Sequence, residues 1–195
     1  MVLTPSTMLP LGTAAPDFAL REVTSGKTVK LADFAQKKAL VVMFICNHCP
    51  YVKHVEDGLT AFGRDYEARD VALVAISAND AETHPDDAPE KLAATAKARG
   101  WKFTYLYDQA QSVAQRYTAA CTPDFFLFDG QRKLVYRGQF DSSRPNSGVP
   151  VTGADLRAAL EALLAGKPVA REQKPSLGCN IKWRTGNEPA YFGSR

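Results

Sequence analysis

The sequence has no hydrophobic run long enough to cross a membrane. Its longest apolar run, Ala39–Cys46, is far shorter than the roughly 20 residues that a membrane-spanning helix needs. A block of one charge is missing as well: Lys and Arg total 24, Asp and Glu total 21, and the formal net charge is +3. Nucleic-acid-binding proteins usually carry a clustered basic surface. We therefore expect neither a nucleic acid nor a membrane among the partners.

Signals of secretion are also lacking. Met1–Pro16 has neither the basic start nor the apolar segment of a secretory signal peptide. We interpret it as an irregular lead-in and expect a cytoplasmic protein. Cysteine is scarce, with four residues in a chain of 195. Disulfide scaffolds belong mainly to small secreted domains, so these cysteines are not expected to form one.

The sequence does contain an alternation of strand and helix patterns. Continuous β-rich apolar runs, such as Ala39–Ile45 and Val71–Ser77, are typical of central strands covered on both faces. The alternation predicts an α/β fold with a central mixed sheet flanked by helices. The other expected strands are residues 103–106, an N-terminal hairpin of residues 15–20 and 28–31, and a hairpin of residues 124–128 and 133–140; the expected helices are residues 51–66, 90–99, 109–117 and 154–164.

The helical pattern ends at Gly166, which divides the chain into a domain at residues 12–166 and a C-terminal extension at residues 167–195. The extension is polar, but it contains Trp183, Tyr191 and Phe192. These aromatic residues favour docking of the extension on the domain over plain disorder.

The main chemical signal is Cys46-Asn47-His48-Cys49, placed between a predicted strand and a predicted helix. At a helix N-terminus, unpaired N–H groups and the helix dipole favour a thiolate over a thiol. His48 supplies a neighbour that lowers the thiol pKa further. The spacing lets Cys49 attack a mixed disulfide held on Cys46. We therefore expect Cys46 to be the exposed nucleophile and Cys49 the more buried resolving thiol.

Other interpretations of this motif remain open. The two cysteines could be core residues without a redox role, and His48 could be a solvated turn residue. The pair could also be half of a zinc site, which needs two further ligands. No second CxxC occurs in the sequence, although Cys121 could approach the pair.

A second segment, Cys121-Thr122-Pro123, directly precedes the predicted strand 124–128. Strand, CxxC and helix, followed by Thr-Pro, strand, hairpin and helix, resemble the thioredoxin superfamily. The resemblance implies that Pro123 is cis and packs against the CxxC pair. It also implies that Thr122 offers backbone groups to a partner peptide, so that both residues form the substrate-docking groove.

Pro16-Asp17-Phe18 and the insertion between Ser77 and Trp101 are similar to the redoxin branch of this superfamily, which includes alkyl hydroperoxide reductase/thiol-specific antioxidant proteins. More narrowly, three stretches resemble a group of bacterial redoxin-domain proteins: FICNHCPYVKH, ACTPDFFLFD and KPSLGCNIKW. The resemblance covers roughly residues 12–166 and implies a thioredoxin-like fold with antioxidant or disulfide-exchange activity.

The sequence departs from this family in several places. Ile45 stands where thioredoxins usually carry Trp, and the buried proton acceptor of thioredoxin would fall near Leu40, so His48, water or another group must manage protons. The PxxxTxxC pattern of peroxiredoxins is absent, because Ala39 and Met43, or Val42 and Cys46, occupy its Pro and Thr positions. Arg137 is a weak candidate for polarising a peroxide.

The function predicted from the sequence is thiol–disulfide exchange with protein or small-molecule disulfides through Cys46 and Cys49. No organic cofactor is needed, because the dithiol itself carries the two electrons. A thiol peroxidase and a cysteine-based metal-binding module are the alternatives. Cys121 and Cys179 are candidate auxiliary thiols: Cys121 could form an alternative disulfide, complete a metal site or be a small buried residue, and Cys179 could be an extra resolving thiol near Cys121 or the CxxC pair.

Overall fold

The computed structural model describes residues 3–193 and contains a central mixed sheet of seven strands. Its strand order is β3-β2-β6-β5-β4-β8-β9, in which β4 runs parallel to β5 and antiparallel to β8. The predicted central mixed sheet is therefore confirmed. The strands are β2 (Ala19–Glu22), β3 (Thr28–Lys30), β4 (Ala39–Phe44), β5 (Val71–Ser77), β6 (Thr104–Tyr107), β8 (Asp124–Asp129) and β9 (Leu134–Gly138).

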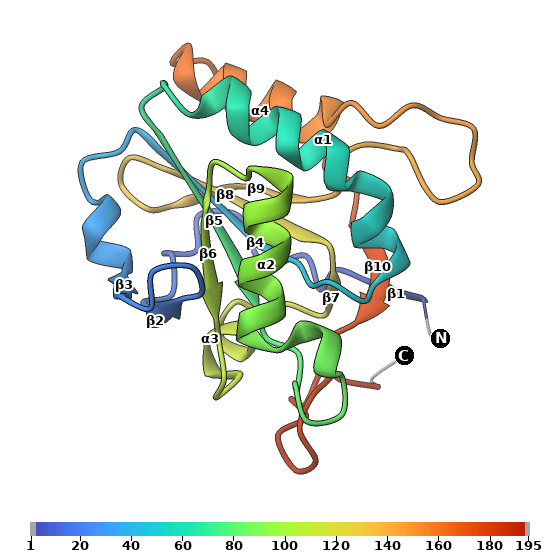
Figure 1. The fold of residues 1–195 in the computed structure, drawn as a ribbon. Coiled ribbons are helices and arrows are strands. Elements are labelled where there is room, and N and C mark those ends of the chain that lie inside the picture. The colour runs from blue at the N-terminus through green and yellow to red at the C-terminus, as the bar shows by residue number, and fades with distance from the viewer. Residues whose placement is uncertain (1–2, 194–195) are drawn as a thin grey trace.

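Helices cover both faces of this sheet (Figure 1). They are α1 (Pro50–Tyr66), α2 (Pro89–Arg99), α3 (Ser112–Arg116) and α4 (Ala154–Leu164), with short 3-10 turns η1 (Leu31–Phe34) and η2 (Pro85–Asp87). One apolar core lies between the sheet and α1, α2 and α4, and a second lies between the sheet and α3. The predicted α/β class with flanking helices agrees with this arrangement.

Strand β4 contributes side chains to both cores, which is why its sequence is an unbroken apolar run. Successive side chains on a strand point to opposite faces. Val41 and Met43 accordingly enter the core beneath α1, whereas Val42 and Phe44 enter the other core. Every residue of β4 is buried. The strand thus holds the segment that follows it, Cys46-Asn47-His48-Cys49, at a rigid position.

A second sheet of three short strands lies beside the first turn of α1 (Figure 1). It consists of β1 (Leu3–Pro5), β10 (Leu177–Asn180) and β7 (Cys121–Thr122), with β10 in the middle. The expectation of an irregular lead-in was wrong for residues 3–5. Strand β1 has no local hydrophobic periodicity, and it forms because the distant strand β10 supplies its hydrogen-bond partners.

The segment of the extension that follows β10 packs against the domain. Ile181, Trp183 and Tyr191 join the core that contains α3. The buried side chain of Gln111 fastens this segment, because its Nε2 donates to the carbonyl oxygens of Ala78 and Lys182 at 2.7 and 2.9 Å. These contacts fix the end of β10 relative to the central sheet.

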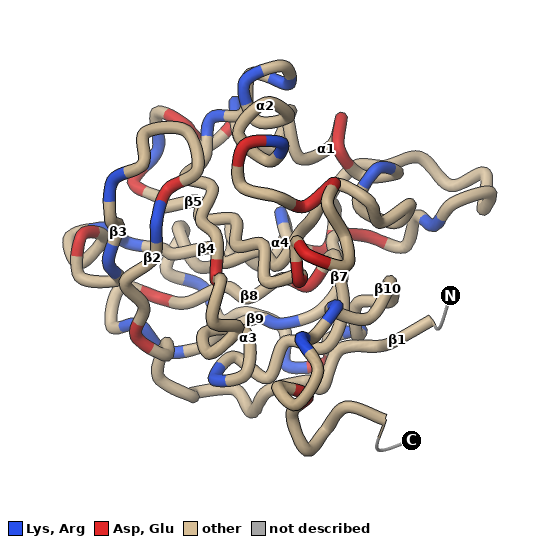
Figure 2. Tube along the Cα trace, turned by 60° about the horizontal axis from the view of Figure 1, so that its bottom comes forward, with Lys and Arg blue, Asp and Glu red and all other residues tan. Residues whose placement is uncertain are grey.

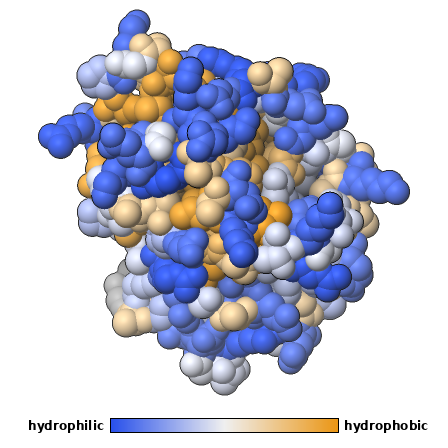
Figure 3. Space-filling model, turned by 90° about the vertical axis from the view of Figure 1, so that its left-hand side faces the viewer, coloured by the Kyte–Doolittle hydropathy of each residue, from blue (hydrophilic) through white to orange (hydrophobic). Residues whose placement is uncertain are grey.

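The surface carries both signs of charge. Figure 2 shows acidic and basic residues interspersed along the chain. On the face drawn in Figure 3, hydrophilic side chains predominate, with smaller apolar areas between them. Among residues 3–193, no helix is long and apolar enough to span a bilayer.

Candidate functional site

The CxxC motif connects β4 to α1, and the helix begins one residue before the predicted range of 51–66. Cys49 is the N-cap residue, and α1 starts at Pro50, whose ring suits a first helical turn. The backbone N–H groups of Val52 and Lys53 both donate to the Cys49 carbonyl oxygen at 3.0 Å. The helix N-terminus therefore lies beside Cys49 and not, as expected, at Cys46.

Thr122 connects the two cysteines of the motif to the rest of the site. Its peptide bond to Pro123 is cis, as the resemblance implied. Its Oγ1 lies 3.4 Å from Cys46 Sγ, and its carbonyl oxygen accepts a hydrogen bond from Cys49 Sγ at 3.2 Å. The Cys46 and Cys49 side chains are close enough to shift each other's pKa. The two sulfur atoms and both polar groups of Thr122 thus form one cluster.

Strand β10 brings Cys179 to this cluster. In the antiparallel pairing of β10 with β7, Cys179 lies opposite Thr122. Directly opposed residues share a face of the sheet, so Cys179 lies on the side of Thr122 that contacts the CxxC pair, and Cys179 and Cys49 shift each other's pKa. The backbone edge of Thr122, which the resemblance assigns to a partner peptide, is therefore paired with the chain's own extension.

Cys121 lies outside the cluster. It precedes Thr122 on β7, where neighbouring side chains point to opposite faces, and it lies opposite Asn180. Its Sγ is 3.7 Å from the Pro123 carbonyl oxygen. Cys121 therefore lies on the other side of β7 from the Thr122 side chain, while its charge still acts on Cys179; its expected approach to the CxxC pair stays a prediction.

All four cysteines are thiols and all are buried. The exposed fraction of Cys46 is 1%, and that of Cys49 is 0%. The difference in exposure that was expected between nucleophile and resolving thiol is therefore not observed. The two residues between them, Asn47 and His48, are partly exposed, and 19% of the His48 side chain reaches solvent.

Asp87 is a member of the site that the sequence did not indicate. Its carboxylate accepts hydrogen bonds from the backbone N–H groups of Asn47 and His48, from the Asn79 side chain at 2.9 Å and from His48 Nδ1 at 2.5 Å. Asp87 ends η2, in a polar loop distant from the motif in sequence. No local pattern marked it, since only the tertiary structure places η2 against the motif.

The electrostatic surroundings of the two motif cysteines differ. Burial raises the pKa of Cys46, and the Cys49 side chain and the Asp87 charge act in the same direction. The neighbouring Cys179 and Cys46 side chains lower the pKa of Cys49, against the effect of burial. Cys49 is therefore the sulfur atom whose surroundings favour ionisation more strongly.

Asp87 and His48 place a buried carboxylate and an imidazole beside Cys46, whereas Leu40 offers no acid. Burial alone would raise the pKa of Asp87, but hydrogen bonds from His48 and Asn79 outweigh it, so that the pKa is lowered and the carboxylate stays ionised. Cys46 Sγ, a His48 ring nitrogen and an Asp87 oxygen lie within 4.8 Å of one another. A thiol, an imidazole and a carboxylate in this order are suited to proton transfer from the thiol.

The same three residues form the one group of potential metal ligands found within residues 3–193. Both Asp87 oxygens already accept hydrogen bonds, two each, so a metal ion would have to displace them. Cys121 does not join the group, contrary to the expected three-thiolate site. The donor set therefore fits a proton-transfer site better than a metal centre.

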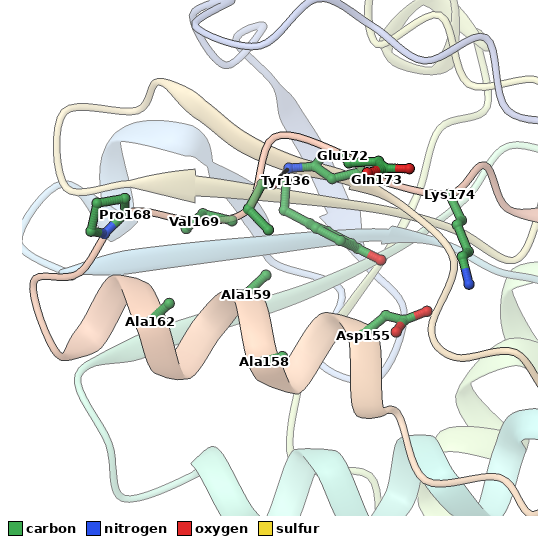
Figure 4. A pocket seen from close by; sticks show the side chains of 11 residues that line it. Tyr136, Asp155, Ala158, Ala159, Ala162, Pro168, Val169, Glu172, Gln173 and Lys174 are labelled. Carbon is green, nitrogen blue, oxygen red and sulfur yellow. Dashed lines mark hydrogen bonds between the residues drawn. The ribbon is translucent and has the colours of Figure 1, made fainter.

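Two further features lie away from the cysteines. The Arg137 guanidinium donates to the Leu9 carbonyl oxygen and to Gln173, so it is not available to polarise a peroxide at Cys46. A cavity of about 310 Å³ lies between α4, β9 and the start of the extension. Figure 4 shows Tyr136, Asp155 and Lys174 among the side chains around it. No cysteine lines this cavity, and it is not part of the candidate site.

Comparison with known proteins finds a matching family profile and two similar structures that align over nearly their whole length. Residues 11–137 match the sequence profile of the AhpC/TSA family, whereas no curated protein matches the sequence. The crystal structure of an uncharacterized conserved protein from Geobacillus kaustophilus is 54% identical, with a TM-score of 0.92, and the match covers 94% of this chain and 97% of that chain. A hypothetical protein from Sinorhizobium meliloti 1021 is 51% identical with a TM-score of 0.92, over 94% of this chain and 100% of that chain.

A more distant likeness concerns the fold alone. The thioredoxin domain of a thiol-disulfide oxidoreductase from Bacteroides vulgatus is 20% identical, with a TM-score of 0.55. The match covers 67% of this chain and 89% of that chain. The fold is thus thioredoxin-like, as the resemblance implied.

Proposed function

This chain belongs to the AhpC/TSA family, and we propose that it is a thiol–disulfide oxidoreductase that exchanges electrons through Cys46 and Cys49. The observation that carries the proposal is the contact between the two sulfur atoms beside Thr122 and the cis Pro123. Its substrates are protein or small-molecule disulfides. In a reducing compartment such as the cytoplasm, where thiols stay reduced, the chain would act as a reductant.

In the reducing direction, Cys46 attacks one sulfur atom of the substrate disulfide. The substrate S–S bond breaks, the first substrate thiol leaves, and a mixed disulfide remains on Cys46. Cys49 then attacks Cys46 Sγ and releases the second substrate thiol. The substrate disulfide gains two electrons and two protons, and the Cys46–Cys49 dithiol loses them in forming its own disulfide.

His48 and Asp87 support the first step. The Asp87 charge raises the pKa of Cys46, so Cys46 needs a base to become a nucleophile. His48 accepts the proton of Cys46 and passes it to the leaving substrate thiol. Asp87 acts as a positioning residue, because its carboxylate accepts hydrogen bonds from Nδ1 of His48 and from the backbone N–H groups of Asn47 and His48.

Turnover of disulfides by the purified protein tests the proposal. We expect reduction of insulin or oxidised glutathione, coupled to dithiothreitol, to be lost in Cys46→Ser and in Cys49→Ser. The matched control is Cys121→Ala, which removes a buried sulfur atom on the other face of β7 and should retain turnover. Equal turnover by wild type and Cys46→Ser would refute the proposal.

A thiol peroxidase is the second candidate, and one observation favours it. The Thr122 hydroxyl, 3.4 Å from Cys46 Sγ, supplies from across the fold the group that the missing PxxxTxxC pattern would have supplied. A peroxide is also small enough to reach a cysteine that is only 1% exposed. Attack on a peroxide would leave sulfenic acid on Cys46, which Cys49 would condense to the same disulfide with loss of water.

Hydrogen peroxide consumption with dithiothreitol separates the two candidates. If peroxide is consumed at catalytic rates while insulin and glutathione disulfides are not reduced, the peroxidase replaces the oxidoreductase as the function. If disulfides turn over and peroxide consumption does not exceed that of Cys46→Ser, the peroxidase candidate is eliminated.

A further inference from the structure

We propose that Cys179 is a third redox thiol, which takes over the disulfide from Cys46 by forming a Cys49–Cys179 bond. This inference rests on the proposed function, because the Cys46–Cys49 disulfide is its starting state. It adds a second disulfide that shares Cys49 and that involves the C-terminal extension.

The position of Cys179 is built by two separate contacts. The register of β10 against β7 places Cys179 opposite Thr122, whose carbonyl oxygen contacts Cys49 Sγ at 3.2 Å. The packing of β10 beside α1 then places Cys179 in the same apolar core as Cys49, where the two thiols shift each other's pKa. Cys49 consequently contacts both Cys46 and Cys179, and it is the sulfur atom that can bond to either.

Gly178 shows how closely β10 is held. A Cβ atom at this position would lie 2.0 Å from the Thr122 carbonyl oxygen, so no other residue fits without displacing β10. The neighbouring residue, Cys179, is 1% exposed and belongs to the same core as Cys46 and Cys49. A cysteine held so closely to a reactive thiol has a high effective concentration for exchange.

The exchange step is an isomerisation without an external oxidant. The Cys179 thiolate attacks Cys49 Sγ of the Cys46–Cys49 disulfide. The bond between Cys46 Sγ and Cys49 Sγ breaks, and the bond between Cys49 Sγ and Cys179 Sγ forms. Cys46 leaves as a thiolate, and the proton lost by Cys179 is balanced by the proton that Cys46 takes up, with His48 beside it. The Cys49 side chain and burial raise the pKa of the Cys179 thiol, and the charge of Lys182 opposes them only in part. The Cys49 contribution is lost once Cys49 is bonded to Cys46, so Cys179 is more readily ionised in the disulfide state than in the dithiol state.

The new disulfide changes what the site can do. After the exchange Cys46 is again a thiol, while Cys49 is no longer available to resolve a mixed disulfide on it. The bond also fixes β10 covalently against α1, over the Thr122 backbone edge that a partner peptide would need. The Cys49–Cys179 form is therefore a state in which peptide access to this edge is blocked.

Disulfide mapping in a set of variants tests the proposal. Cys46→Ser retains Cys49, Cys121 and Cys179, and it should form an intramolecular Cys49–Cys179 disulfide in a buffer of oxidised and reduced glutathione. After acid quenching and alkylation, only Cys121 should remain alkylatable. The double variant Cys46→Ser with Cys179→Ser should instead carry glutathione on Cys49, and Cys121→Ala in the Cys46→Ser background should leave the Cys49–Cys179 bond intact.

Two outcomes are distinct failures. If Cys179→Ser forms the Cys46–Cys49 disulfide but Cys46→Ser never forms Cys49–Cys179, the third-thiol proposal is wrong and the proposed function stands. If Cys179→Ser fails to form Cys46–Cys49 while folded, as judged by circular dichroism and urea unfolding, the proposed function itself is wrong. In wild type, peptide mapping across the glutathione series should detect both disulfides.

Discussion

Cys46 has two neighbours with opposite effects on the ionisation of its thiol. The Asp87 charge raises the pKa of Cys46, whereas the hydrogen bond from the Thr122 hydroxyl lowers it. Because these groups come from different elements, η2 and β7, each can be removed without changing the motif itself. The pH dependence of Cys46 alkylation, followed by peptide mass, therefore reports on both.

Asp87→Asn should ease the ionisation of the Cys46 thiol and yet lower the turnover of disulfides. Loss of the charge lowers the pKa of Cys46, so alkylation should begin at lower pH. Disulfide turnover should nevertheless fall by roughly 10–100-fold, because His48 loses its positioning partner. Asp86→Asn is the matched control, since the Asp86 side chain is 66% exposed and pairs with Lys91. An alkylation profile that stays in place in folded Asp87→Asn would contradict the assigned role.

Thr122→Val should shift the alkylation profile of Cys46 in the other direction. Valine is nearly isosteric and preserves the backbone pairing with Cys179, but it removes the hydroxyl beside Cys46 Sγ. The pKa of Cys46 should rise, so alkylation should begin at higher pH. Thr122→Ser retains a hydroxyl and should restore the wild-type profile. If serine and valine variants behave alike, the hydroxyl has no effect on the thiol.

At the scale of elements, β10 connects the extension to the site. It pairs on one side with β1 and on the other with β7, and its Cys179 faces the start of α1. The CxxC motif, by contrast, lies between β4 and α1 and is contacted by Thr122 of β7 and Asp87 of η2. Displacement of β10 should therefore affect Cys179 without removing the Cys46–Cys49 pair.

Gly178→Ala tests this separation. The added Cβ would meet the Thr122 carbonyl oxygen at 2.0 Å, and the resulting strain should lower the free energy of unfolding by roughly 1–3 kcal/mol. Cys179 should become alkylatable, while oxidation still links Cys46 to Cys49. Gly130→Ala is the control, because its nearest neighbour atom would lie 3.5 Å away. Unchanged urea unfolding and a protected Cys179 would show that β10 accommodates the methyl group.

At the scale of the whole molecule, the ionisation of the Asp124 carboxyl makes the stability of the fold depend on pH. It starts β8, is fully buried, and accepts one hydrogen bond, from Ser6 Oγ at 2.9 Å. Its other carboxylate oxygen has no partner among residues 3–193. Burial raises the pKa of Asp124 from 3.8 to about 7. The folded protein therefore retains this proton to a higher pH than the unfolded chain does.

Stability should consequently fall as the pH rises from about 4 to about 7. In this range the unfolded chain loses the proton of Asp124 while the folded protein keeps it, so the folded state binds more protons. Asp124→Asn should flatten this slope, with a change on the order of a few kcal/mol across the range. Urea unfolding at about pH 5 and about pH 8 measures it. Asp57→Asn, at a side chain that is 96% exposed, should leave the slope unchanged.

The sequence by itself determined the α/β class, the central strands β4 and β5, the helices around them and the CxxC motif between β4 and α1. These features follow from local hydrophobic periodicity and from turn residues, which a single sequence displays. The helix α4 was predicted with its observed bounds, Ala154–Leu164. The cis Pro123 came from the family resemblance and not from a local pattern.

Only the tertiary structure decided which groups surround the two motif cysteines. Asp87 lies in a polar loop that carries no signal of its own, and β1 and β10 are short strands that exist through each other's hydrogen bonds. In the sequence Cys121 stands beside Thr122-Pro123 and Cys179 stands in a polar extension, and both were candidate auxiliary thiols. The pairing of β10 with β7 places Cys179 against Cys49 and turns Cys121 away, because side chains alternate along a strand and its register is set by contacts between distant segments.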